Sequence, residues 1–149
     1  MALDSPSIRV IPTETIEVEA LCSLYDAVGW STYTREPERL LAAIEGAHFL
    51  VVAWEGDRLI GLARAISDDV SIAYVQDILV RPSHQGQGLG RRLLQAVLDR
   101  YPHVRQKVLL TDDRPEQLRF YAALGFHNTR ELRKTPLNAF VIIEGAELA

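Results

Sequence analysis

The sequence predicts an α/β fold in which a mixed, mostly antiparallel sheet carries helices on both faces. Two apolar strand-like segments, 49–54 and 59–66, are separated by four turn residues and indicate a hairpin. A strand at 71–80 is then followed by a helical stripe and another short strand, the order of a parallel crossover. A chain of 149 residues can bury a sizeable core, and we expect one domain, 1–149.

The N-terminal part of the chain predicts one strand and two helices. Ile8–Ile11 is expected to be a strand that Pro12 closes. Residues 16–28 place apolar side chains at helical spacing, and Gly29 provides a stop. A second helix is expected from about Pro37 to Gly46.

The second half of the chain alternates helices and strands. Residues 89–100 place leucines and a valine along one stripe, which predicts an amphipathic helix. A short strand is expected at 108–111 and a final one at 140–143. Asp113 followed by Glu116 is the spacing of a capping box and predicts the start of another helix.

Composition and charge exclude several classes of protein. Hydrophobic residues make up 48% and charged residues 24%, and no apolar run approaches the roughly 18 residues of a membrane span. Residues 81–107 carry six basic side chains and one acidic, whereas residues 1–80 carry thirteen acidic and five basic. The basic segment favours an anionic ligand. Outside residues 81–107 acidic side chains outnumber basic ones, which argues against nucleic acid as a partner and permits a cationic substrate.

Cysteine and histidine usage indicates neither a disulfide nor a metal site. Cys22 is the single cysteine, so a reducing compartment, and hence a cytoplasmic location, is expected. The N-terminus lacks the pattern of a signal peptide. The four histidines show no metal-ligand spacing, and we expect no metal. His84, in the loop before the glycines, is expected at the surface.

The segment Gln85–Arg92 is glycine-rich and stands between a predicted strand and a predicted helix. Gly86, Gly88 and Gly90 leave the backbone without side chains where the helix begins. The first amides of a helix have no partner within it and favour an anion. The segment is therefore a candidate pyrophosphate cradle, with a simple tight turn as the alternative.

Two known phosphate motifs do not fit this segment. A dinucleotide fingerprint requires glycine where Arg91 stands. A nucleoside-triphosphate loop requires Gly-Lys-Ser/Thr, which occurs nowhere in the chain.

The segment does resemble the acetyl-CoA signature of the GNAT superfamily of N-acetyltransferases, Gln/Arg-x-x-Gly-x-Gly/Ala. Gln85, Gly88 and Gly90 match it, after Val80-Arg81-Pro82. Downstream, Phe120–Phe126 is similar to the superfamily's Phe-Tyr-x-x-x-Gly-Phe segment. The resemblance implies the GNAT fold, in which two middle strands splay apart around the cofactor.

The resemblance implies acetyl-CoA as cosubstrate and assigns residues to bind it. Backbone amides of the loop would hold the pyrophosphate, and those of Ile78 and Val80 the pantetheine arm. The thioester carbonyl would meet an amide at Leu79 or Val80. The loop residues expected to bind the cofactor are Gln85, Gly86, Gln87, Gly88, Leu89, Gly90 and Arg91.

Two residues are candidates for proton transfer. Tyr121 matches the superfamily's tyrosine, which resembles a general acid beside the sulfur, and a phenol with a pKa of about 10 is protonated at neutral pH. If Gly125 follows the helix cap, Phe126 packs back onto Tyr121 in a Schellman motif. Asp77, an acid in an apolar strand, is the candidate base, with an ion pair to Arg64 or the capping of a turn as the alternatives.

The expected function is transfer of acetyl from acetyl-CoA to a primary amine, by direct attack in a ternary complex. A small-molecule acceptor suits the acidic remainder of the chain, and Trp30, Tyr33 and Tyr74 are expected to line its pocket, with simple packing as the alternative. A noncatalytic acyl-CoA-binding sensor and a protein lysine or N-terminal acetyltransferase stay open. A homodimer through the apolar segment 140–143 also stays open.

Overall fold

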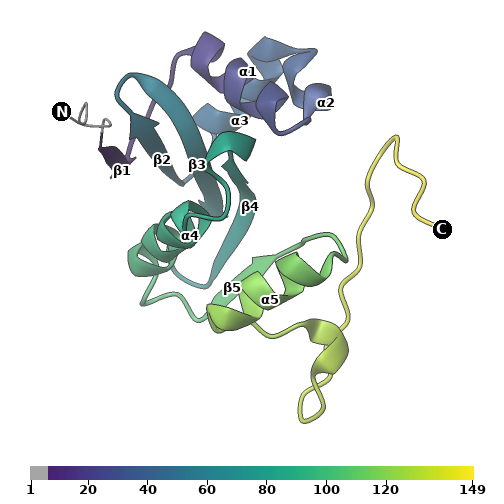
Figure 1. Ribbon diagram of the computed structural model, residues 1–149. Helices are drawn as coiled ribbons and strands as arrows, with labels where there is room; N and C mark the ends of the chain where they lie inside the picture. Colours follow the sequence, from purple (N-terminus) through teal and green to yellow (C-terminus); the bar gives the residue numbers. More distant parts are fainter. Residues whose placement is uncertain (1–6) are drawn as a thin grey trace. The chain divides into compact units, whose positions relative to one another are not determined.

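Residues 7–149 are described by a computed structural model, and their strands form one sheet (Figure 1). Strand order along the sheet follows chain order; β1 to β4 are antiparallel, and β5 runs parallel to β4. This confirms the predicted mixed, mostly antiparallel sheet. Its strands are β1 (Ile8–Pro12), β2 (Phe49–Glu55), β3 (Arg58–Ser67), β4 (Ile72–Val80) and β5 (Gln106–Leu109).

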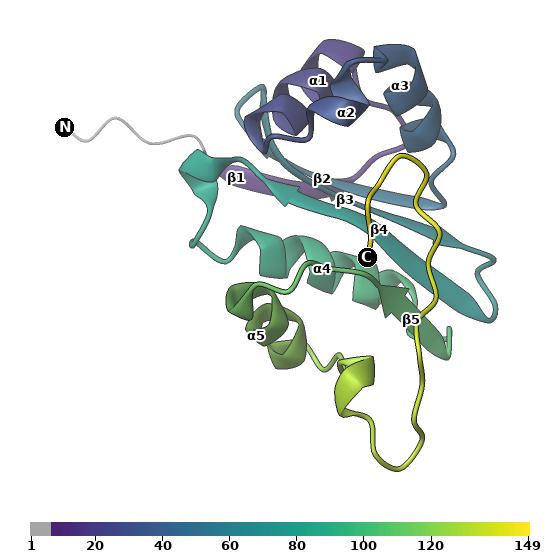
Figure 2. The same cartoon turned by 90° about the vertical axis from the view of Figure 1, so that its right-hand side faces the viewer.

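Helices cover both faces of this sheet, as the sequence predicts. Figure 2 shows three N-terminal helices on one face and α4 (Leu89–Arg100) on the other. The N-terminal helices are α1 (Val18–Ala27), α2 (Ser31–Thr34) and α3 (Pro37–Glu45). The four-residue α2 has no counterpart among the predicted elements, because one helical turn is too short to show a periodic apolar face.

The described chain divides into two compact units at the bond between Leu110 and Thr111. The first unit contains the whole sheet and α1 to α4. The second, Thr111–Ala149, contains α5 (Pro115–Ala123) and a 3₁₀ turn at Thr129–Glu131.

A hydrophobic core lies between the sheet and the N-terminal helices. Leucines of α1 and α3 pack against side chains of β2, β3 and β4. Its largest fully buried members come from α1, α3 and β3: Leu21, Leu24, Tyr25, Leu40, Ile44, Leu59 and Leu62.

Helix α4 packs closely on the other face of the sheet. Its buried stripe is Leu89, Leu93, Leu94 and Val97. Gly61 of β3 permits the close approach, because a Cβ at that position would lie 3.0 Å from a terminal carbon of Leu93. The predicted amphipathic helix and its bounds are confirmed, and α4 leads out of the glycine segment in a fixed direction.

The end of α5 forms the predicted Schellman motif. The amide of Phe126 donates to the carbonyl of Tyr121, and that of Gly125 to the carbonyl of Ala122. Gly125 has φ +92°, and the Phe126 ring meets the Tyr121 ring edge-on with centroids 6.0 Å apart. The motif therefore restrains the Tyr121 ring.

Two predicted features of the second unit are wrong. The helix α5 begins at Pro115, and its N-cap is Arg114 without a side-chain bond, so Asp113 and Glu116 do not form a capping box. The carboxylate of Asp112 accepts from the Arg114 amide instead. Residues 140–143 are not a strand; they pair with no other strand of the described chain, and Phe140 is 93% exposed.

Candidate active site

The glycine segment leaves β4 through a 3₁₀ turn, Pro82–His84, and ends at α4. Gly86 and Gly88 adopt left-handed φ angles of +77° and +79°, which L side chains rarely adopt. A Cβ added at either glycine would meet no heavy atom within 4 Å. The glycines are therefore required by the backbone conformation, and the space beside them is open to a ligand.

The amides at the start of α4 have no side-chain partner. Gly88 is the N-cap residue, and no side chain bonds to the first turn of the helix. Helix amides without partners, with the positive end of the helix dipole behind them, form an anion site. This arrangement fits a pyrophosphate, as the sequence predicts for Leu89, Gly90 and Arg91.

The base of the loop is held by buried polar side chains. Arg81 is 7% exposed, and its guanidinium donates to the carbonyl of Leu59 and to the hydroxyl of Ser23. His84 lies 3.1 Å from the carboxylate of Glu55 on β2. It is only 8% exposed, so its predicted surface position is wrong. No local pattern predicts this burial, because Glu55 is 29 residues away in the chain.

One edge of β4 is unpaired beside this loop. The parallel ladder to β5 ends at the pair Val75 and Leu109, and no strand of the described chain pairs with that edge beyond it (Figure 2). The amide of Arg81 donates to Ile60 on β3. Since backbone groups alternate in direction along a strand, the amides of Ile78 and Val80 point to the open edge.

This alternation separates the two candidates for the amide that meets the thioester carbonyl. The amide of Leu79 points to β3, and the side chain of Leu79 is part of the hydrophobic core. The amide of Val80 points to the open edge, and the carbonyl of Val80 already accepts a hydrogen bond from the Gln85 side chain at 3.0 Å. The geometry therefore favours Val80 over Leu79 for this role.

Asp77 lies in a buried hydrogen-bonded cluster on the face of β4 that the N-terminal helices cover. Its Oδ2 accepts from Nε of Arg64 at 2.5 Å and from the hydroxyl of Tyr25 at 2.7 Å. Arg64 is 5% exposed and Asp77 3%. These contacts are the ones expected if Asp77 forms an ion pair with Arg64. Loss of the carboxylate charge would leave the buried guanidinium of Arg64 without a counter-charge.

The predicted acceptor residues lie close to this cluster. The rings of Tyr25, Trp30 and Tyr33 lie 5.4 to 6.2 Å apart, centroid to centroid. Burial and the negative charge of Asp77 raise the pKa of Tyr74. Trp30 is 36% exposed and Tyr33 is half-buried, so the aromatic cluster reaches the surface. Tyr25 belongs to the same aromatic cluster, whereas the sequence shows it only as one residue of the predicted helix 16–28.

Tyr121 lies on α5 in the second unit. Burial and the nearby Asp112 carboxylate raise the pKa of its phenol above the usual value of about 10. The phenol is therefore protonated throughout the neutral range, which is the form that a general acid requires.

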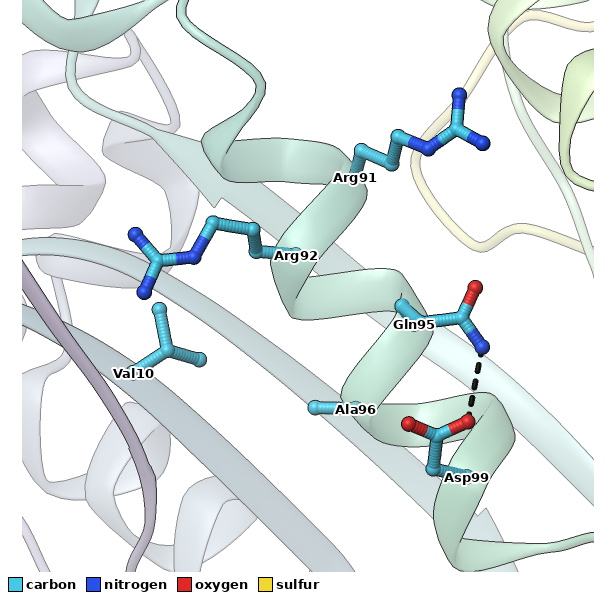
Figure 3. A pocket seen from close by; sticks show the side chains of 6 residues that line it. All are labelled: Val10, Arg91, Arg92, Gln95, Ala96 and Asp99. Atoms are coloured by element: carbon cyan, nitrogen blue, oxygen red, sulfur yellow. Dashed lines mark hydrogen bonds between the residues drawn. The ribbon is translucent and has the colours of Figure 1, made fainter.

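The two arginines at the start of α4 point in different directions. Figure 3 shows Arg92 extending towards Val10 of β1 and Arg91 extending the other way. A shallow pocket of about 360 Å³ lies between α4 and Val10 of β1. It is lined by Val10, Arg91, Arg92, Gln95, Ala96 and Asp99, and includes none of the predicted acceptor residues.

Comparison with known proteins decides the family. The family model described as an acetyltransferase (GNAT) domain matches residues 21–136, which is most of the chain and extends across both units. The chain belongs to the GNAT family. Members of this family are acetyl-CoA-dependent N-acetyltransferases, and the fold and signature predicted from the sequence are those of the family.

Individual relatives agree with this assignment. A GNAT family acetyltransferase from Streptococcus pneumoniae superposes with a TM-score of 0.78 at 28% identity, over 94% of this GNAT chain and 100% of that one. The uncharacterized N-acetyltransferase ycf52-like of Prochlorococcus marinus is 33% identical over 75% of this chain. The histone acetyltransferase TAP1 of Glycine max is 33% identical over 76%.

This GNAT chain is shorter than the curated relatives that it matches. It covers 63% of the Prochlorococcus protein and 52% of the Glycine protein. Within residues 7–149, no helix is long and apolar enough to cross the bilayer. Over the same range, no three His, Cys, Asp or Glu side chains are grouped as metal ligands would be.

Proposed function

We propose that this GNAT protein transfers acetyl from acetyl-CoA to a primary amine by direct attack in a ternary complex, with a small molecule as acceptor. The observation that carries the proposal is the pair of adjoining backbone features at the end of β4. A glycine loop with left-handed turns leads into an uncapped helix, and the neighbouring strand edge is unpaired. One suits a pyrophosphate and the other an extended pantetheine arm.

The loop would hold the nucleotide end of acetyl-CoA. Amides from Gln85 to Arg91 would donate to the pyrophosphate, and the six basic residues of segment 81–107 would favour its charge. The Gln85 side chain, bonded to Val80, would keep the loop and the strand edge in register. These contacts use main-chain donors held in place before the ligand arrives, which lowers the entropic cost of binding.

The strand edge and Tyr121 would serve the chemical step. Acetyl-CoA supplies the acetyl thioester; the amine forms a C–N bond to its carbonyl carbon as the C–S bond breaks. The amide of Val80 would donate to the carbonyl oxygen as negative charge develops there. Tyr121 would give its phenolic proton to the leaving thiolate.

The attacking amine must be neutral, and Asp77 is poorly placed to deprotonate it. An alkylammonium has a pKa of about 10, so most of the acceptor is charged at neutral pH. The expected base, Asp77, is buried and its Oδ2 is bonded to Arg64 and Tyr25. We propose that the proton leaves through water and not through Asp77.

The aromatic cluster would recognise the acceptor. Trp30, Tyr33 and Tyr74 would offer aromatic rings to the acceptor, and the faces of aromatic rings attract ammonium groups. The thirteen acidic residues of segment 1–80 add a favourable field for a cation. Amines that combine a cationic group with an apolar or aromatic body, such as arylalkylamines, fit this site best, and polyamines come next.

The proposal is tested by following free thiol while the protein is incubated with acetyl-CoA and a panel of primary amines. Turnover with at least one small amine is the expected result. Tight CoA binding without turnover on any amine would instead indicate the noncatalytic acyl-CoA sensor. Labelling of lysines or N-termini in a proteome extract, with small amines inert, would indicate a protein acetyltransferase, the class that the name of the Glycine relative describes.

A matched pair of glycine variants tests the loop. Gly88→Ala forces a side chain into a left-handed conformation that costs roughly 1–2 kcal/mol, so the loop is expected to rearrange and the Kd for CoA to rise about tenfold. Gly145→Ala is the control, because Gly145 has the same φ of +79° and equally open surroundings but lies outside the loop. Equal Kd values for both variants and the natural protein in calorimetry would remove the loop from the binding site.

Location and assembly complete the proposal. A chain whose single cysteine is Cys22 suits the reducing cytoplasm. The exposed apolar segment 140–143 suits contact with a second copy of the chain, although it does not form the strand expected for such a contact.

A further inference from the structure

Strand β4 contains one residue more than its partner β3 requires. Asp77 pairs with Arg64, but the next pair on β3, Ala65, is Val75, so Gln76 has no partner residue. This is a β-bulge, which bends a strand and increases its twist. The parallel ladder between β4 and β5 also ends at Val75. The bulge at Gln76 therefore directly follows the last residue of β4 that pairs with β5.

The bulge also changes which side chains share a face of the sheet. Residues that pair across antiparallel strands lie on the same face, and Tyr74 pairs with Ile66 while Asp77 pairs with Arg64. Ile66 and Arg64 are two residues apart and so share a face. Tyr74 and Asp77 consequently lie on one face although they are three residues apart, which a regular strand would not allow.

A single carboxylate oxygen fixes the residue that follows the bulge. Oδ2 of Asp77 accepts hydrogen bonds from Arg64 on β3 and from Tyr25 on α1, and Arg64 also donates to the carbonyl of Ala43 on α3 at 3.3 Å. Tyr25 is 0% exposed, and all three residues of the cluster are at least 95% buried. A register slip of one residue would turn Asp77 to the opposite face and leave Arg64 buried without its counter-charge.

We propose that Tyr25, Arg64 and Asp77 are positioning residues that hold the bulge at Gln76 and thereby keep the Val80 amide at the open edge of β4, where acetyl-CoA would bind. Asp77 acts on the reaction through the backbone that follows it, and it takes no proton from the acceptor. The amides of Ile78 and Val80 stand one and three residues beyond Asp77, so the register at Asp77 sets their direction. This inference rests on the proposed function only for the identity of the ligand at that edge.

The test combines three variants with hydrogen exchange, calorimetry and pH–rate profiles. Tyr25→Phe removes one hydrogen bond, Asp77→Asn removes the negative charge while keeping an acceptor oxygen, and Arg64→Lys keeps the positive charge. Leu40→Ala is the control, because Leu40 belongs to the same hydrophobic core but its side chain makes none of the hydrogen bonds of the cluster. Exchange of segment 76–80 is measured in the free protein, and Kd for CoA and the kcat profile in the complete reaction.

We expect Asp77→Asn and Tyr25→Phe to speed exchange in segment 76–80 and to raise the Kd for CoA about tenfold, with the shape of the pH–rate profile unchanged. Arg64→Lys is expected to fall between these variants and the natural protein. Leu40→Ala is expected to lower the melting temperature. Its hydrogen exchange in segment 76–80 and its Kd for CoA should equal those of the natural protein.

Several results would overturn the proposal. One is that Asp77→Asn and Tyr25→Phe both show the same hydrogen exchange in segment 76–80 and the same Kd for CoA as the natural protein. Another is loss of kcat in Asp77→Asn with unchanged Kd and a missing acidic limb in the profile, which is the behaviour of a general base. If Asp77→Asn does not fold, Tyr25→Phe decides alone, since it removes no charge. If the natural protein binds no CoA, the proposed function fails, and the exchange data still decide whether the cluster holds the bulge.

Discussion

Replacing Tyr121 by phenylalanine is expected to lower kcat by roughly 10²- to 10⁴-fold and to leave the Kd for CoA within a factor of about two. The phenyl ring keeps the packing of the natural side chain but has no proton to give to the leaving thiolate. The ring of Phe126, edge-on at 6.0 Å, and the Schellman motif at Gly125 should hold the substituted ring in the same place. Steady-state kinetics and calorimetry measure the two effects separately.

The pH dependence of the natural enzyme provides a second sign of the same role. Burial and the charge of Asp112 raise the pKa of Tyr121, so the protonated, active form persists to higher pH than a free phenol would allow. Activity should therefore fall only above pH 10, and this alkaline limb should vanish in Tyr121→Phe. Tyr101→Phe is the control, a buried tyrosine bonded to His48, for which only stability should fall. Unchanged kcat in Tyr121→Phe would remove the general-acid assignment.

Replacing Arg64 by methionine is expected to lower the free energy of unfolding by about 3–5 kcal/mol. The substitution leaves the Asp77 carboxylate, which is 3% exposed, without a cation. For a domain of this size, such a loss lowers the melting temperature by roughly 10–15 °C. Arg39→Met is the matched control, because the pair between Arg39 and Glu36 is solvent-exposed and contributes at most about 1 kcal/mol.

Chemical denaturation of Arg64→Met and Arg39→Met measures the two losses of stability. Equal losses in the two variants would contradict a buried carboxylate that depends on Arg64 for its counter-charge.

The sequence predicts correctly those helices and turns whose conformation depends on residues close to one another in the chain. The stripe of apolar residues in α4 and the turn at Gly125 both depend on neighbours within a few positions, and the structure confirms both. The glycine segment and the motif around Tyr121 were found for the same reason. The capping box failed because Pro115 sets the first turn of α5, with Asp112 rather than Asp113 bonded to the Arg114 amide.

Features that depend on distant residues have a weak signal in the sequence or none. The burial of His84 requires Glu55 from another strand, and the sequence predicts the ion pair of Asp77 with Arg64 only as an alternative. The bulge at Gln76 is a mismatch between two strands, so neither strand shows it by itself. The apolar residues at 140–143 have strand propensity, but propensity alone does not supply a partner strand.

Calorimetric titration of the natural protein with CoA tests most directly whether the main-chain donors at the start of α4 bind a diphosphate. We expect CoA to form a one-to-one complex of micromolar affinity, from which acetyl-CoA displaces it. Absence of binding with CoA at millimolar concentration, in protein shown to be folded, would contradict it.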